Sequence, residues 1–163
     1  MYIRIPNNIK TIRDAKKSPE GDLSTPEKTI AITIAAFLRY QENMDDGIRI
    51  LDYVKGPNPT SAYERQFIRD RFRQNGNHFM FSYLQGSTPE NNYTPTEPWM
   101  LKIHNCGSPY NDDKYVKYEI TCGGADTPRT VILRYKPSTS QWFLWEQYLL
   151  VGIKKSAFED PWG

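Results

Sequence analysis

Histidine and cysteine carry much of the acid–base, nucleophilic and metal chemistry of proteins, and this sequence has two of each. They are His78, His104, Cys106 and Cys122, and they show neither an H-x-x-x-H nor a C-x-x-C spacing. We therefore expect no metal site and no other cofactor. His104 and Cys106 would share one face of a strand, but no third residue is placed to orient such a pair. A polar histidine without a catalytic role is the favoured interpretation.

The two cysteines are predicted to be unpaired. They flank a predicted β-hairpin and so lie at its opposite ends, farther apart than the ~7 Å between Cα atoms that a disulfide allows. Free cysteines are commonly buried, so we expect both as small apolar side chains in the core.

The glycine-rich segment Gly123–Arg129 does not form a phosphate-binding loop. It lacks the G-x-x-x-x-G-K-[ST] spacing, and it joins two predicted strands instead of leading into a helix. A Gly-Gly turn, in which Asp126 binds local N–H groups and pairs with Arg129, is the favoured interpretation. The alternative is that Asp126 and Arg129 contact a ligand at the mouth of the sheet.

Three arginines form a basic stripe on a predicted helix. Arg65, Arg69 and Arg73 are spaced at i, i+4 and i+8 and so lie on one face. Such a stripe would suit an acidic partner or a nucleic acid backbone. However, Lys and Arg total 21 against 19 Asp and Glu, a formal net charge of only +2. A solvated helix face is therefore favoured, and a nucleic acid partner is not expected.

The segment from Gly86 to Pro98 is rich in Pro, Thr and Asn, which predicts an ordered surface loop. Asn91 and Asn92 suit tight turns, and Tyr93 would anchor the loop by burying its ring. Because binding residues often lie in structured loops, a structural and a recognition role both stay open here.

The composition describes the domain that must position these residues. The chain has 163 residues with 4 Trp, 11 Tyr and 7 Phe, enough large side chains for one globular core. Disorder, collagen-like structure and a disulfide scaffold are excluded. No apolar run is long enough to span a membrane, and the start lacks the features of a signal peptide. We therefore expect a cytoplasmic protein with no membrane partner.

Helices are predicted in the first half of the chain. Residues 1–24 form a polar segment, and a single α+β domain is expected over 25–163. Thr25-Pro26-Glu27 starts a helix that runs to about 43, and Asp45–Gly47 is expected to break it before a short amphipathic piece. Ser61 and Glu64 form a capping box for a further helix to about 74. Its expected inward-facing residues are Tyr63, Phe67, Ile68 and Phe72.

From Trp99 onward the apolar residues alternate, which predicts antiparallel strands. In a first hairpin we expect Leu101 opposite Ile120. In a second, apolar residues pair on both faces, and the predicted pairs are Lys136 with Gln141, Tyr135 with Trp142, Arg134 with Phe143, Leu133 with Leu144 and Ile132 with Trp145. Helices packed on a C-terminal antiparallel meander define an α+β fold, of which the cystatin-like cone is one known arrangement.

Six segments of the chain form recognisable motifs: Gly56–Pro59, Arg65–Arg71, Gly86–Pro95, Gly123–Arg129, Trp142–Glu146 and Asp160–Trp162. They include T-P-E-N-N-Y-T-P, G-G-A-D-T-P-R, W-F-L-W-E and the C-terminal D-P-W. These segments resemble a family of small, uncharacterised bacterial proteins, a domain of unknown function. The resemblance covers about Thr25 to the C-terminus and implies a bacterial protein. It assigns no activity, ligand or catalytic residue.

Without a catalytic constellation, the excess of aromatic residues and ordered loops favours a non-enzymatic interaction or adaptor domain with a protein partner. The alternative is a small-molecule pocket, binding or weakly catalytic, inside a curved sheet. The sequence fixes neither the partner nor the oligomeric state. The candidate ligand- or partner-binding residues are Tyr93, Trp99, His104, Asp126, Arg129 and Trp145.

Overall fold

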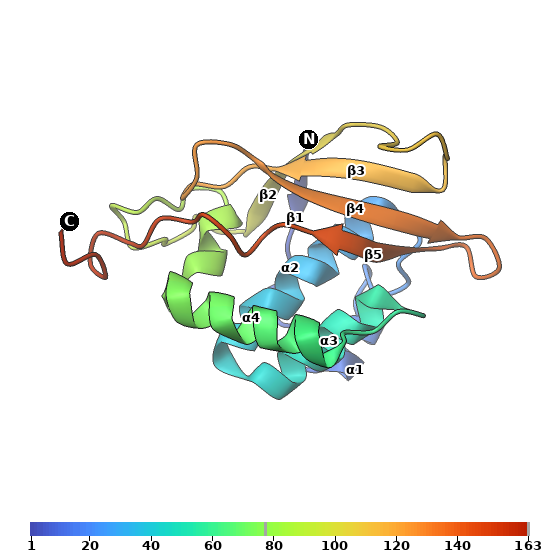
Figure 1. Cartoon of the computed structure of the whole chain (residues 1–163), viewed down its shortest axis with the longest axis horizontal. Coiled ribbons are helices and arrows are strands. Elements are labelled where there is room, and N and C mark those ends of the chain that lie inside the picture. The colour runs from blue at the N-terminus through green and yellow to red at the C-terminus, as the bar shows by residue number, and fades with distance from the viewer. Residues whose placement is uncertain (77, 163) are drawn as a thin grey trace.

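The computed structural model describes residues 1–76 and 78–162, so Asn77 and Gly163 lie outside the described residues. In Figure 1 the helices lie against one face of the sheet, and the opposite face of β3 (Tyr115–Ile120) and β4 (Arg129–Lys136) carries no helix. The elements are β1 (Tyr2–Arg4), α1 (Ile12–Lys17), α2 (Pro26–Glu42), α3 (Met44–Lys55), α4 (Ala62–Asn75), the 3-10 helix η1 (Phe79–Tyr83), β2 (Met100–Asn105), β3 (Tyr115–Ile120), β4 (Arg129–Lys136) and β5 (Gln141–Gln147).

The sheet has five antiparallel strands in the order β1-β2-β3-β4-β5 and is curled into a half-barrel, which confirms the α+β prediction. The predicted C-terminal meander forms β2 to β5. The sequence patterns did not reveal β1, a three-residue strand that pairs with the first half of β2. A strand this short shows too few alternations to be recognised.

The predicted register of the first hairpin was wrong by two residues. Ile120 lies opposite Ile103, not Leu101, and Glu119 lies opposite His104. Leu101 pairs with Ile3 of β1 instead. Because side chains alternate with a period of two, this shift leaves every residue on its predicted face.

The predicted register of the second hairpin is confirmed near its turn, but the predicted contact of Ile132 with Trp145 was wrong. An irregularity between Ile132 and Leu133 shifts the pairing, so that Ile132 lies opposite Glu146. One extra residue on β5 produces this shift, as in a β-bulge. The confirmed pairs are Lys136–Gln141, Tyr135–Trp142, Arg134–Phe143 and Leu133–Leu144.

The first long helix, α2, begins as predicted. The Thr25 hydroxyl accepts a hydrogen bond from the Lys28 N–H, and Pro26 occupies the first helical position. The predicted break at Asp45–Gly47 was wrong, because the chain turns earlier. The Asn43 side chain caps α3 by accepting from the Asp46 N–H, and acidic residues are favourable in such a first turn.

Helix α4 contacts the rest of the domain along a narrow side. Ile68 is buried, and the Phe72 ring lies 4.5 Å from that of Tyr40 and 4.7 Å from that of Phe79, between centroids. The prediction that Tyr63 faces inward was wrong, since this side chain is 82% exposed. Ser61 caps the helix by accepting from the Glu64 N–H, but the predicted capping box is only half formed, because the Glu64 carboxylate binds the Lys55 ammonium instead.

The core lies between α2 and the concave face of the sheet. Eleven of the 17 residues of α2 are buried. The inner-face residues of β2, β3 and β4 pack in the same core: Leu101, Ile103, Val116, Tyr118, Ile120, Val131 and Leu133.

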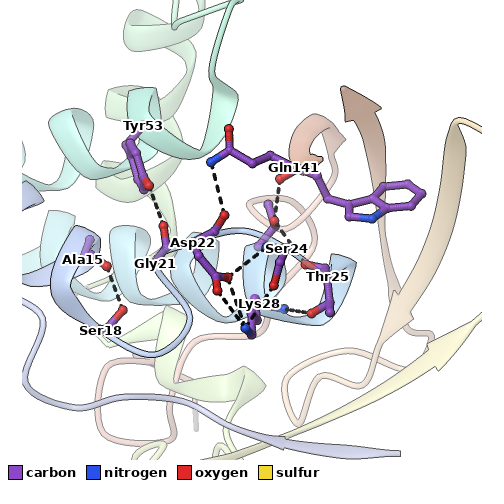
Figure 2. A network of polar contacts seen from close by, with 11 residues as sticks. Ala15, Ser18, Gly21, Asp22, Ser24, Thr25, Lys28, Tyr53 and Gln141 are labelled. Atoms are coloured by element: carbon purple, nitrogen blue, oxygen red, sulfur yellow. Dashed lines mark hydrogen bonds and ion pairs between the residues drawn. The ribbon is translucent and has the colours of Figure 1, made fainter. Parts of the chain in front are cut away.

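Residues 1–24 contribute to this core as well. Ile5 and Leu23 are buried in it, as are Ile9 and Ala15. Figure 2 shows how the turn before α2 is held: the Tyr53 hydroxyl donates to the Gly21 carbonyl, and the Gln141 side-chain amide donates to the Asp22 carbonyl. This turn therefore connects α3, α2 and the β4–β5 hairpin.

The crossing of α2 and α3 depends on Gly47. A Cβ atom at this position would lie 2.5 Å from the Cα atom of Tyr40. We predict that Gly47→Ala lowers the free energy of unfolding by about 1–3 kcal/mol despite the gain in helix propensity, because the two backbones must separate. Chemical denaturation measures this value. Arg49→Ala, at an exposed position of the same helix, is the control and should change it by less than about 0.5 kcal/mol. Equal stability of Gly47→Ala and wild type would contradict close helix packing.

Candidate functional site

The outer face of the sheet carries a group of aromatic side chains around one arginine. The Arg134 guanidinium lies 4.8 Å from the centre of the Trp145 ring and 5.4 Å from that of Tyr115. The Tyr115 and Trp145 rings meet edge-on at 5.7 Å, and Tyr110 meets Tyr115 edge-on at 5.0 Å. We call Tyr110, Tyr115, Arg134, Trp145 and the neighbouring Tyr148 the outer-face cluster.

Strand register brings these side chains together. Tyr115 begins β3 and lies directly opposite Arg134 of β4, so both project from the outer face. Trp145 lies on β5 where the pairing with β4 shifts. Such an irregularity re-aims a side chain, and here the Trp145 ring lies within reach of both Arg134 and Tyr115.

The rim of the cluster is open to solvent. Tyr110 is 45% and Tyr148 51% exposed. The Tyr148 hydroxyl donates to the Glu146 carboxylate at 3.0 Å, and this hydrogen bond raises the pKa of Tyr148. Beside Trp145 and Tyr148, between β5 and α3, lies a hollow of about 180 Å³ that Leu51 helps to line. The hollow is open to solvent and has room for about one side chain, and Lys55, Glu146 and Gln147 line it beside the apolar residues.

The electrostatics of the cluster suit recognition. Arg134 is exposed and forms no ion pair within the described residues, while its contacts with two ring faces restrict its motion. Its N–H groups therefore remain available to a carboxylate of another molecule. Over residues 1–76 and 78–162, no three His, Cys, Asp or Glu side chains are grouped to hold a metal ion.

Of the six predicted site residues, Trp145 and His104 lie on the outer face. His104 is exposed on β2 opposite Glu119. Within the described residues its side chain forms no hydrogen bond, ion pair or ring contact with the outer-face cluster, so the structure does not bring these two predicted residues into one contact group. Trp99 lies elsewhere: it is half-buried just before β2, where its ring meets Phe81 edge-on at 5.7 Å.

Tyr93 anchors the loop before β2, as one of its two interpretations required. Its ring is 3% exposed, and its hydroxyl donates to the Lys154 carbonyl. Burial raises the pKa of Tyr93 to about 12. Asn91 holds the same loop by accepting from the Thr88 and Thr94 N–H groups. The Tyr93 ring is therefore not available on the surface.

Arg129 and Asp126 do not form the predicted pair. The Arg129 guanidinium donates to the carbonyls of Val151 and Gly152, at 3.0 and 2.9 Å. Asp126 lies 3.8 Å from the Lys154 ammonium, and its side chain is 92% exposed. Arg129 thus fixes the segment after β5. Asp126 points into solvent, away from the Arg129 guanidinium.

The cysteines are unpaired as predicted, but only Cys122 is buried. Its sulfur lies 3.3 Å from the Ser82 hydroxyl. The predicted burial of Cys106 was wrong: this residue follows β2 and is exposed, and its sulfur approaches the main-chain carbonyl of His104 at 3.7 Å. Desolvation raises the pKa of the Cys106 thiol, which disfavours the nucleophilic thiolate.

A family model covers most of the chain: Domain of unknown function (DUF6935) matches residues 4–157. The chain belongs to this family. This confirms the resemblance to an uncharacterised family, and the matched range extends from β1 beyond β5. Among curated proteins and among solved structures no match was found. None of the helices in the described part of this family member has the length and apolar character needed to cross a membrane.

The sequence patterns missed four members of the outer-face cluster. Alternation in 115–120 placed Tyr115 away from the inner-face residues, and the predicted pairing placed Arg134 opposite Phe143. These two signals together pointed to an aromatic outer face. Tyr110 and Tyr148 carry no comparable signal, because they lie in irregular segments outside the strands.

We predict different effects for the two charged residues of the Gly123–Arg129 turn. Arg129→Ala should lower the free energy of unfolding by about 1–3 kcal/mol, because two carbonyls lose charge-assisted hydrogen bonds. Asp126→Ala should leave the urea midpoint unchanged, because its ion pair is solvated. Urea denaturation followed by tryptophan fluorescence measures both. Equal effects would show that Arg129 does not hold the segment after β5.

Proposed function

We propose that this protein is a non-enzymatic interaction or adaptor domain that binds a protein partner through the outer-face cluster. The observation that supports this most is the exposed Arg134 between the rings of Tyr115 and Trp145, on a sheet face that no helix covers. Tyr, Trp and Arg are the residues most enriched where binding energy concentrates in protein interfaces. The cytoplasmic location remains a prediction from the sequence, and the bacterial origin remains what the family resemblance implies.

The geometry suggests what the partner presents. An apolar side chain would enter the hollow beside Trp145 and Tyr148, and a carboxylate would accept hydrogen bonds from Arg134. The rings already contact one another in the free protein, so binding costs little side-chain entropy. The cluster therefore combines an apolar anchor with a charged contact that orients it.

The concave face of the sheet favours this proposal over a small-molecule pocket. The first long helix, α2, packs against that face, and its eleven buried residues are enclosed by the sheet on one side and by the other helices, chiefly α3, on the other. Two of the polar residues expected to line a pocket there, His104 and Asp126, are exposed on the surface instead. A binding role is thus better supported on the outer face.

The test is capture of a partner from native lysate, followed by measurements with the purified partner. We predict that Arg134→Glu/Tyr148→Ala weakens binding at least about tenfold, because it removes the charged contact and one wall of the hollow. Both side chains are exposed, so the fold should persist. Circular dichroism verifies that it does.

The matched control is Arg71→Glu/Tyr63→Ala, which makes the same changes on α4. It should bind the partner like the wild type. Equal binding by both double variants would contradict the proposal, and so would failure of the wild type to capture any partner.

A further inference from the structure

A second surface lies in the helical layer, between α3 and α4. Two adjoining hollows of about 450 and 360 Å³ form one groove there, and both are lined by Tyr40, Met44 and Arg69. The groove exists because α4 meets the domain through few side chains, chiefly Ile68 and Phe72. It shares no lining residue with the outer-face cluster.

The arginines of the groove differ in how they are held. Arg65 forms an ion pair with Asp52 at 3.2 Å and donates to the Thr60 hydroxyl at 2.9 Å. This member of the predicted basic stripe therefore has a structural role. Arg69 and Arg73 of α4 are exposed and have no ion-pair partner within the described residues.

The wall of the groove formed by α3 also carries a positive charge. Arg49 of α3 lines the same groove, is exposed, and likewise forms no ion pair in the part of the chain described. Arg49, Arg69 and Arg73 thus lie on both walls outside any ion pair of the described residues, and they outnumber the two aspartates, Asp45 and Asp52, that line the same groove. A guanidinium recognises a carboxylate through two parallel hydrogen bonds, which makes an acidic occupant complementary to this groove.

The groove also offers apolar contacts. Met44 is 44% exposed, and Phe72 lines the groove while its ring packs on Tyr40. Methionine adapts its shape to different partners and is common at binding surfaces. An occupant with carboxylates alone would leave these side chains unused.

The length of the groove matches a peptide segment. Arg65 and Arg73 are eight residues apart on α4, which corresponds to about 12 Å along the helix axis. About four residues of extended chain cover this length. Because Asp45 and Asp52 also line the groove, a continuous phosphate backbone would meet negative charge there, whereas a peptide can place its carboxylates selectively.

We propose that the groove between α3 and α4 binds an acidic segment of another protein. Carboxylates of the segment would pair with Arg69, Arg73 and Arg49, and an apolar side chain between them would rest on Met44 and Phe72. This site does not depend on the outer-face cluster. Together the two surfaces would allow the domain to hold two partners at once.

The test uses a displayed library of random peptides of about 12 residues, longer than the groove, selected on the whole protein. The selected peptides should be rich in Asp and Glu with interspersed apolar residues. Fluorescence anisotropy of a labelled peptide then measures affinity. R69Q/R73Q should weaken binding at least about tenfold, and Met44→Ala should weaken it less.

The control variant R13Q/R71Q removes the same charge from positions that do not line the groove, and it should bind like the wild type. Selection of no peptide, selection of peptides without acidic residues, or equal binding by R69Q/R73Q would each overturn the proposal. A labelled single-stranded oligonucleotide provides a further arm. Oligonucleotide binding that R69Q/R73Q abolishes, without selection of acidic peptides, would assign the groove to nucleic acid and overturn it as well.

Discussion

The burial of α2 against the concave face of the sheet is the constraint on which the rest of the structure depends. The helix meets the sheet with polar contacts as well as apolar ones: Thr29 donates to the Trp142 carbonyl at 2.6 Å, and Tyr118 donates to Glu27 at 2.7 Å. These bonds fix α2 relative to β3 and β5. Since the helix fills the inner face, large surfaces for recognition remain on the outer face and on the far side of the helices.

This arrangement explains why the aromatic residues divide into two groups. Rings on the inner side, such as Tyr118 of β3 and Phe37 of α2, are buried in the core. The curl of the sheet that accommodates the helix turns the outer side into a convex surface. Side chains from β3, β4 and β5 converge there only where register and the irregularity in β5 align them. The position of the outer-face cluster is thus a consequence of how the core closes.

Strong local signals predicted much of the fold. The caps at Thr25 and Ser61 located the starts of α2 and α4, and alternation located β2 to β5. The sequence could not show the register of β2 against β3, because a shift of two residues leaves every side chain on the same face. The start of α3 was missed because Asp45–Gly47 suits a break and a first helical turn equally well.

The candidate site was harder to predict than the fold. The type and spacing of residues do not reveal whether a polar side chain is already hydrogen-bonded, or an aromatic ring already buried, within the fold. Arg129 and Tyr93 looked suited to binding, yet both hold backbone carbonyls of the segment after β5. Arg134 carried no signal of its own and Arg69 was assigned to a solvated helix face, yet neither has a charged partner among the described residues. With a net charge of only +2, most charges of the chain can balance one another. Cations left unbalanced beside exposed rings or an apolar groove are therefore the better guide to recognition.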